Sequence, residues 1–401
     1  MAIPFSISTW TPDPAWNCRE FFLLHLVGNG SRSLGSGFPS LMCEFLDKPL
    51  PVGSAQYMCM RALTTSYYLM RTAGPDACCQ AMITYSSAIK AVQAAIDQSC
   101  GTVESDIFMS IMCLCLYENI IVTMPRSWIR HYEGISRMIE MHGPDHYRTG
   151  RNRDILMAFR YTIVISAGTL RHHCFLAEPA WRQIIELNEA ESHDAFGTVL
   201  NIAVDVPGLL HGGDHMNEQR LSTWELYTLS MTLQRTMLAL ERWWYTFFPS
   251  LSPNNDSSYS PYVASAMGFY LMVLLLLEKL CFNLNVPWLP ASTLLPENPA
   301  ALNEAPTMAV CAQRRHVVAS EILHLAQQSI GPDTGIYDIL RFIMPLHVAY
   351  DHLLPGSPQT EALNNLMHTV MAGQHGFQMA RRYKGQYTSV NGLSDDEHSL
   401  D

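Results

Sequence analysis

The sequence predicts an all-α protein, built as a single large multi-helix array. From about residue 54 onward, apolar residues recur at spacings of three to four, which is the period of an α-helix. Alternation with a period of two is hardly seen, and no hairpin signal separates two strand-like runs. The composition is 48% hydrophobic and 15% charged, which is typical of a folded chain with much buried surface.

The clearest predicted helix runs from Arg126 to His142. Pro125 precedes it and Gly143-Pro144 follows it, and these are common start and stop signals. Gly143 is expected to adopt the left-handed αL conformation that ends many helices. One apolar stripe follows from the spacing of Trp128, Tyr132, Ile135, Ile139 and His142.

Five further helices are expected from the apolar pattern: Tyr85–Ile96, Asp106–Val122, Arg153–Arg171, Leu221–Phe248 and one around Val263–Leu277. Asp106–Val122 is apolar on all sides, as a helix buried in a large core must be. Val263–Leu277 is the most apolar stretch. It is shorter than the roughly 20 residues that cross a bilayer, so we interpret it as a core helix without a membrane partner.

The expected domain organisation has three parts. Residues 1–50 are rich in Gly, Ser and Pro and are expected to be loosely ordered, apart from one apolar island at Phe21–Val27 that could form a short docking helix. Residues 51–390 are expected to form the helical domain, and residues 391–401 an acidic, disordered tail. Two irregular stretches, Ser250–Ser258 and Val286–Thr307, are interpreted as loops within one array rather than as linkers between domains.

Charge and cysteine usage restrict the function classes. The formal net charge of −11 weighs against direct binding of nucleic acid, because phosphate binding needs clustered Lys and Arg. The densest group of arginines, between Arg126 and Arg153, is interleaved with acidic residues and is interpreted as a solvated mixed face. Eleven cysteines, several inside apolar runs, are typical of core thiols in a reducing compartment.

Candidate chemical sites are few, and each has a simpler interpretation. His211-Gly-Gly-Asp-His215 and His142-Gly-Pro-Asp-His146 could hold zinc, but Gly-Gly and Gly-Pro are expected to break a helix, so both are interpreted as polar turns. Arg171-His-His-Cys174 is interpreted as the C-terminus of a helix rather than as a catalytic pair. Nucleotide-binding and hydrolase motifs are absent from the sequence. We therefore expect no enzyme, no metal and no cofactor.

Three segments, taken in order, carry a resemblance to a known family. The first is Tyr85–Gln93. The second comprises Asp106–Phe108, Met112–Glu118, Ser127–Gly134 and His142–Pro144, and the third comprises Arg160–Arg171 and Phe175–Trp181. Together they resemble the fungal-specific transcription factor domain, which is found C-terminal to binuclear zinc-cluster DNA-binding modules. The resemblance rests on the ordered set, since Trp-x-x-His alone would be a weak signal.

This resemblance implies an all-α regulatory domain in which the signature residues have structural roles. The residues that match the signature are Trp128, His131, Gly134, Gly143, Pro144, Arg160 and Trp181. Trp128, His131 and Tyr132 could also line a pocket with Arg160 for a small-molecule effector. The amphipathic period alone explains the aromatic residues as core anchors, and we prefer that interpretation.

The sequence departs from full-length relatives in one respect. A zinc cluster needs six cysteines in two Cys-x-x-Cys arms, and this sequence contains no Cys-x-x-Cys. We therefore expect a transcriptional regulator or coregulator acting through protein contacts, with a zinc-cluster transcription factor as one partner and a homodimer as an open option. A coregulator, a truncated gene model and a decayed regulator all fit this pattern.

The expected location is the nucleus, with the cytoplasm left open, and control of a fungal metabolic gene cluster is one suggested role. The alternative function is a small-molecule-binding or catalytic helical protein in a biosynthetic pathway, derived from the same scaffold.

Overall fold

The computed structural model describes residues 14–27, 38–73, 79–99, 105–124, 126–189, 194–251, 259–288 and 308–381, and the regular structure in these ranges is entirely helical. The main helices are α1 (Pro14–Val27), α2 (Phe38–Asp47), α3 (Ala55–Thr72), α4 (Cys79–Gln98), α5 (Ser105–Ile121), α6 (Ser127–His142), α7 (Gly150–Leu170), α8 (Pro179–Glu189), α9 (Ala195–Ala203), α10 (Val206–Asn217), α11 (Thr223–Leu251), α12 (Pro261–Asn283), α14 (Met308–Ser329), α15 (Ile336–Tyr350) and α16 (Pro358–Asn365). Short turns lie at η2 (Pro144–Tyr147), η3 (Phe175–Ala177) and η6 (Gln378–Ala380), and a π-helical stretch, η5 (Leu366–Gln374), continues α16.

The predicted all-α array is confirmed. The expected tail at residues 391–401 lies outside the described residues.

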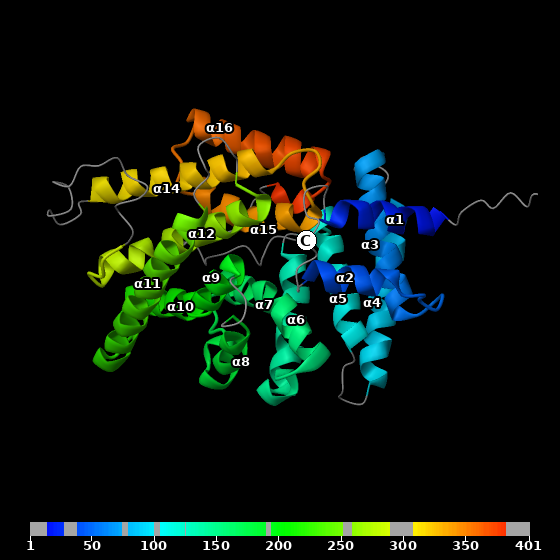
Figure 1. Cartoon of the computed structure of the whole chain (residues 1–401), viewed down its shortest axis with the longest axis horizontal. Coiled ribbons are helices and arrows are strands. Elements are labelled where there is room, and N and C mark those ends of the chain that lie inside the picture. Colours follow the sequence, from blue (N-terminus) through cyan, green and yellow to red (C-terminus); the bar gives the residue numbers. More distant parts are fainter. Residues whose placement is uncertain are drawn as a thin grey trace, which may run out of the picture.

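Two buried helices organise the array, one in each half of the view in Figure 1. In α5, every side chain from Ile107 to Ile120 is buried, and the helix packs against α3, α4 and α6. In α12, the side chains from Ala264 to Leu275 are all buried, and this helix packs against α9, α14 and α15. Both were predicted as core helices, because a helix that is apolar on all sides is stable only when surrounded.

Within the described residues, α12 is the one helix whose length and composition would allow it to cross a membrane. In the structure, 83% of its most apolar window is buried inside the protein. Its apolar surface is therefore accounted for by α9, α10, α14 and α15, which pack around it.

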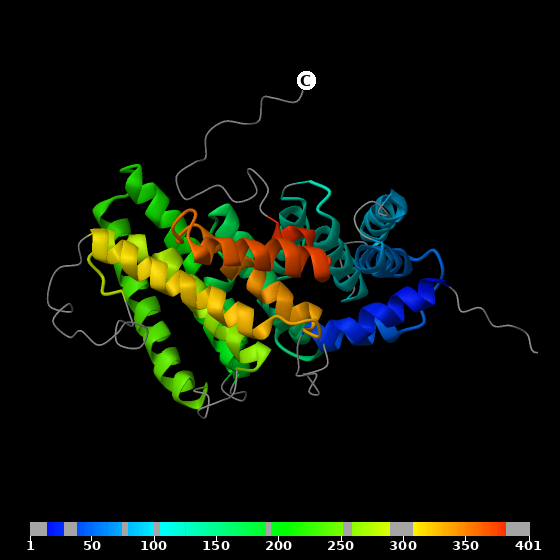
Figure 2. The same cartoon turned by 90° about the horizontal axis from the view of Figure 1, so that it is seen from above.

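The helices on either side of the irregular stretch Val286–Thr307 pack against each other. Residues 289–307 are outside the described ranges, yet α12 before them and α14 after them lie against each other. Figure 2, which views the molecule from above, shows α14 and α16 running along the same side of the array. This arrangement agrees with the interpretation of Val286–Thr307 as a loop within one array.

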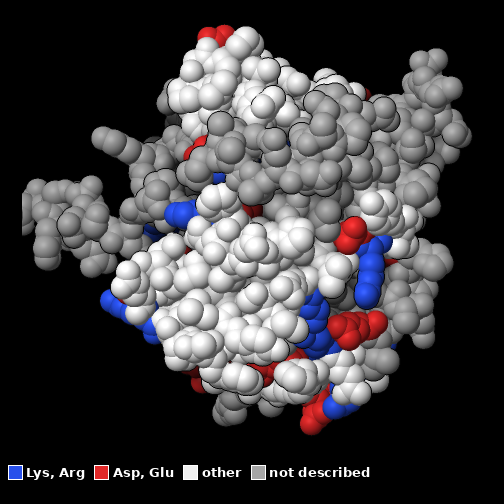
Figure 3. Space-filling model, turned by 90° about the vertical axis from the view of Figure 1, so that its left-hand side faces the viewer, with Lys and Arg blue, Asp and Glu red and all other residues white. Residues whose placement is uncertain are grey.

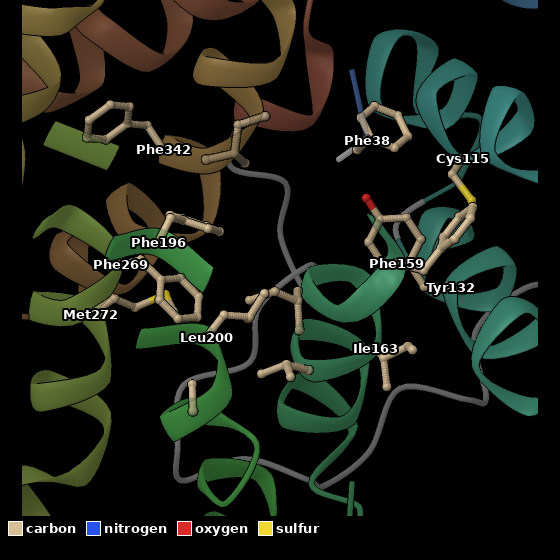
Figure 4. Close-up of a cluster of buried hydrophobic side chains, with 14 of the residues drawn as sticks. Phe38, Cys115, Tyr132, Phe159, Ile163, Phe196, Leu200, Phe269, Met272 and Phe342 are labelled. Atoms are coloured by element: carbon tan, nitrogen blue, oxygen red, sulfur yellow. The ribbon is translucent and has the colours of Figure 1, made fainter. Parts of the chain in front are cut away.

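Helix α15 connects the two halves. It packs against α1 on one side and against α12 and α14 on the other. Its Arg341 is 7% exposed, and the guanidinium carbon lies 4.2 Å from the ring centre of Phe196 on α9 and 4.9 Å from that of Tyr262 on α12. Such contacts favour a desolvated guanidinium. Figure 4 shows the apolar side chains that fill the space between the halves, from Tyr132 and Phe159 to Phe196 and Phe342.

The expectation of a loosely ordered segment at residues 1–50 does not hold for its described part. Helix α1 extends the apolar island at Phe21–Val27 back to Pro14, and α2 forms a second helix from Phe38. Phe22, Leu26 and Phe45 are 0% exposed. The Gly- and Ser-rich residues that suggested looseness are clustered at 28–37, outside the described ranges, while the apolar residues on either side pack into the core.

Truncation of Phe22 tests whether α1 belongs to the folded array. Phe22 packs edge-on against Tyr67 of α3, with ring centres 5.3 Å apart. We expect Phe22→Ala to reduce the free energy of unfolding by about 3–5 kcal/mol, measured by urea denaturation, because a buried aromatic side chain is lost. Leu24→Ala is the matched control, since Leu24 on the same helix is 74% exposed. Equal midpoints for the two variants would show that α1 is not part of the core.

Candidate functional site

The main polar feature inside the family-like region is a network around the buried carboxylate of Glu118. Glu118 is 1% exposed and lies near the end of α5, within a helix that is otherwise almost entirely apolar. Its Oε1 accepts hydrogen bonds from Tyr85 Oη at 2.5 Å and Thr123 Oγ1 at 2.7 Å. Its Oε2 accepts from the Thr123 backbone N–H at 2.9 Å and from the Ser127 hydroxyl. A buried carboxylate is tolerated when donors surround it in this way.

His131 extends this network toward the protein surface. Its Nε2 lies 2.7 Å from Tyr85 Oη. Burial, and then the charge of Glu118, raise the pKa of Tyr85, so the phenol stays protonated and donates its one hydrogen bond to Glu118. The imidazole Nε2–H must therefore be the donor to Tyr85, in a chain that runs from His131 through Tyr85 to Glu118. Burial lowers the pKa of His131, although Glu118 acts in the opposite direction.

This network holds three helices together. Tyr85 lies on α4, Glu118 on α5 and His131 on α6, and the Tyr85 ring stacks on Tyr117 with centres 4.0 Å apart. Glu118 also closes the turn between α5 and α6, where Val122 and Arg126 have positive φ angles of 55° and 74°. A phenol with a raised pKa stays protonated at neutral pH, so the basic phenolate is hardly present. The hydrogen bonds between α4, α5 and α6 support a structural role for this network.

The structure places the seven signature residues in different environments. Trp128 is fully buried beside Tyr132, and His131 belongs to the Glu118 network. Arg160 is 5% exposed on α7 and donates to the side chain of Asn201 on α9, so it ties these two helices. The hypothesis that Arg160 lines an effector pocket with Trp128, His131 and Tyr132 stays a prediction.

The Gly-Pro stop and Trp181 lie in the same region of the fold. Pro144 begins the turn η2, whose Tyr147 packs against Trp181 of α8, with ring centres 5.9 Å apart. Trp181 is 3% exposed and also contacts Phe175, at 4.7 Å between ring centres. These signature positions therefore anchor the chain where it passes from α6 through η2 toward α8.

Gly143 ends α6 as predicted, but its conformation differs from the expected αL. Its φ is 76° and its ψ is 162°, a region that glycine alone occupies readily. The reason is the next residue, because Pro144 forces an extended ψ on the residue before it. Gly134 is different: it lies exposed within α6, and an added Cβ would have no atom within 4 Å.

The prediction that His211 and His215 do not lie on a helix is wrong. Both are on α10, one turn apart, with ring centres at 4.2 Å. The intervening glycines allow close packing, since a Cβ on Gly212 would lie 2.6 Å from the side-chain end of Leu229 of α11 and one on Gly213 would lie 3.3 Å from that of Leu280 of α12.

The other histidine motif was also interpreted as a polar turn, but its first residue, His142, is the last residue of α6, and His146 lies in the turn η2. Across the described ranges, no group of three or more His, Cys, Asp or Glu side chains is arranged to hold a metal ion. Cys174 is 4% exposed, and burial raises the pKa of its thiol to about 12, so it is a poor nucleophile at neutral pH.

Sequence reasoning did not single out Glu118, Tyr85 or Ser127 as a site. The available signal was Glu118 itself, a single carboxylate at the end of a helix that is otherwise apolar over three to four turns. Buried carboxylates are rarely left without partners, so its presence indicates that donors must converge on it. The identity of those donors depends on the packing of α4 and α6 against α5.

The Glu118 network predicts a specific loss of stability. We expect Glu118→Gln to reduce the free energy of unfolding by about 1–3 kcal/mol, because an amide cannot accept from all the donors and leaves one of them buried without a partner. The measurement is urea denaturation followed by circular dichroism. Glu133→Gln is the matched control on the exposed side of α6. If both variants unfold at the same urea concentration, the network does not stabilise the fold.

The two signature glycines of α6 should respond oppositely to alanine. Gly143→Ala places a Cβ in a conformation reserved for glycine and should lower stability by about 1–3 kcal/mol. Gly134→Ala removes a flexible residue from an exposed helical position and should raise stability by about 0.5–1 kcal/mol. Thermal unfolding of both variants measures this. Unchanged stability of the Gly143 variant would contradict the conformational argument.

Comparison with known proteins gives the context for this arrangement. Residues 38–281, which are more than half of the chain and contain the whole Glu118 network, match the family described as the fungal specific transcription factor domain. A stretch of 106 residues is 28% identical to an uncharacterized protein of Emericella nidulans, and it covers 26% of this chain and 22% of that relative. No solved structure matches. On the extent of the family match, this chain belongs to the family that carries the fungal specific transcription factor domain.

Proposed function

We propose that this chain regulates transcription through protein contacts, and that a zinc-cluster protein is the partner that contacts specific DNA sequences. Family membership carries the proposal, since it implies transcriptional regulation and a nuclear role. The finer statements, on the partner and on how the chain acts, rest on charge and cysteine chemistry.

The charge distribution supports the proposal that a partner protein, rather than this chain, contacts DNA. The net charge of −11 produces a field that repels a polyanion. Some arginines of the densest basic region are also neutralised: Arg148 pairs with Asp145 at 2.7 Å, and Arg151 pairs with Glu44 of α2. Fewer free cations are then available to displace counterions from phosphates.

The cysteines support the same proposal. The 401 residues contain no Cys-x-x-Cys pair of the kind that a zinc cluster uses. Among the described residues, eight cysteines are free thiols, and seven of these are buried. Burial raises the pKa of several of them, including Cys59 and Cys281, each to about 12. Thiols in such surroundings behave as small apolar core groups.

A tethering experiment tests the regulatory proposal. The whole chain, fused to an unrelated DNA-binding domain, should change transcription of a reporter several-fold in a fungal host. The Glu133→Gln fusion should behave like the parent, and the destabilised Glu118→Gln fusion should have a weaker effect at equal protein level. Purification of the tagged chain from the same nuclei should recover a zinc-cluster protein, identified by mass spectrometry.

The opposite result would favour the alternative function. A fusion that accumulates in the nucleus but leaves the reporter unchanged would contradict regulation by this chain. Co-purification of biosynthetic enzymes or a bound metabolite would then favour a small-molecule-binding or catalytic role.

A further inference from the structure

Helix α11 carries large apolar side chains on two opposite sides. On one side, Leu233 and Leu240 are 0% exposed and Trp244 is 1% exposed, and these residues pack into the core. The other side carries five exposed large apolar residues, here called the α11 stripe: Trp224 (71% exposed), Tyr227 (56%), Met231 (48%), Leu238 (51%) and Tyr245 (56%). A surface helix normally has one apolar stripe and one polar face. The second stripe of α11 therefore indicates a contact surface.

The spacing of the α11 stripe indicates that its partner is a helix. Trp224, Met231, Leu238 and Tyr245 are each seven residues apart, and Tyr227 is three residues after the first. The seven-residue spacing is that of the a positions of a coiled-coil seam, in which a facing helix inserts its own side chains; of the d positions, Tyr227 is aromatic, whereas Gln234 and Glu241 are polar. The stripe spans three heptads, or about 32 Å at 1.5 Å per residue.

We propose that the α11 stripe binds the same stripe of a second copy of this chain, with the two α11 helices antiparallel. A two-fold axis between Gln234 and Arg235 would set Trp224 against the partner's Tyr245, and Met231 against the partner's Leu238. The larger side chains then meet at the two ends, and the aliphatic ones meet at the centre. A surface that matches itself under a two-fold rotation is what a symmetric dimer requires.

A shallow hollow at the start of α11 supports this pairing. It is lined by Thr223, Trp224 and Tyr227, and the rings of the latter two lie 5.8 Å apart. In the antiparallel arrangement, the side chain that reaches this hollow is the partner's Tyr245. Aromatic side chains seated in such hollows commonly anchor protein interfaces.

Charge also favours a second copy over a charged partner. Figure 3 views the side of the molecule on which α11 lies, and uncharged residues cover the middle of the described surface there, with basic residues at the left and both acidic and basic residues toward the right-hand and lower edges. Arg235 would lie beside the two-fold axis; Asp205 of its own chain lies 3.4 Å from it and reduces its charge, although Asp205 also pairs with Arg182 at 2.6 Å. Two copies can therefore approach along this face despite the net charge of −11 on each.

The available area is consistent with a dimer. Aromatic side chains bury about 150–250 Å² each, so the partly exposed α11 stripe offers roughly 500 Å² of apolar surface per copy. Flanking residues that are also exposed, such as Thr228, Gln234 and Arg242, bring the contact close to the roughly 800 Å² per partner of a standard interface.

Sedimentation equilibrium of the full chain tests the proposal. The parent should sediment at twice the 45.1 kDa mass of one chain. Met231→Glu should raise the dissociation constant by about 100-fold or more, because each dimer would then bury two carboxylates against apolar side chains. Met141→Glu is the matched control: it makes the same substitution at a methionine of α6 that is 79% exposed, and it should leave the dimer intact. Unchanged circular dichroism of each variant confirms folding.

A double variant tests the orientation. Met231→Glu combined with Leu238→Lys opposes unlike charges across an antiparallel pair but like charges across a parallel pair, so it should recover most of the lost affinity. A monomeric parent, a dimer that Met231→Glu leaves unchanged, or a double variant that stays monomeric would each overturn the proposal. The readout is mass in solution, so this outcome is separate from that of the tethering experiment.

Discussion

The burial of one carboxylate constrains the part of the structure formed by α4, α5 and α6. Glu118 lies inside a helix that is surrounded on all sides, so it must be satisfied by protein donors rather than by water. Those donors come from α4 and from the turn and first residue that lead into α6. These hydrogen bonds therefore tie α4, α5 and the start of α6 to one another. The paired positive φ angles at Val122 and Arg126 fit this account, because a short turn must bring Thr123 and Ser127 back to the same carboxylate.

The second half follows a similar physical plan with a different buried charge. Arg341 of α15 is enclosed by aromatic rings from α9 and α12 and by Tyr337 of its own helix, and it pairs with Asp338 at 3.7 Å. Tyr337 in turn stacks on Phe38 of α2, with ring centres 5.3 Å apart. The N-terminal helix pair and the C-terminal helices thus meet around α15. That contact explains why residues 14–27 and 38–50 fold with the array although their composition suggested looseness.

Glycine shows why local rules predicted some features and missed others. Gly-Pro after a helical pattern correctly predicted the end of α6, because proline restricts the residue before it wherever it occurs. Gly212-Gly213 led to the wrong prediction of a turn. There the missing side chains let α10 approach Leu229 and Leu280, a requirement that depends on helices distant in sequence. The Glu118 network was missed for the same reason, because its donors come from neighbouring helices that local sequence rules do not identify.

The sequence by itself determined the helical class, the two fully buried helices α5 and α12, the extent of α6 and the family signature, because these follow from apolar period and local backbone chemistry. Tertiary structure decided which polar residues meet and which face of a helix remains open. The pattern of α11 is apolar on two sides, and nothing local distinguishes them. Packing against α9, α10 and α12 buries Leu233, Leu240 and Trp244 and leaves the α11 stripe exposed, because a helix can turn only one side toward a core.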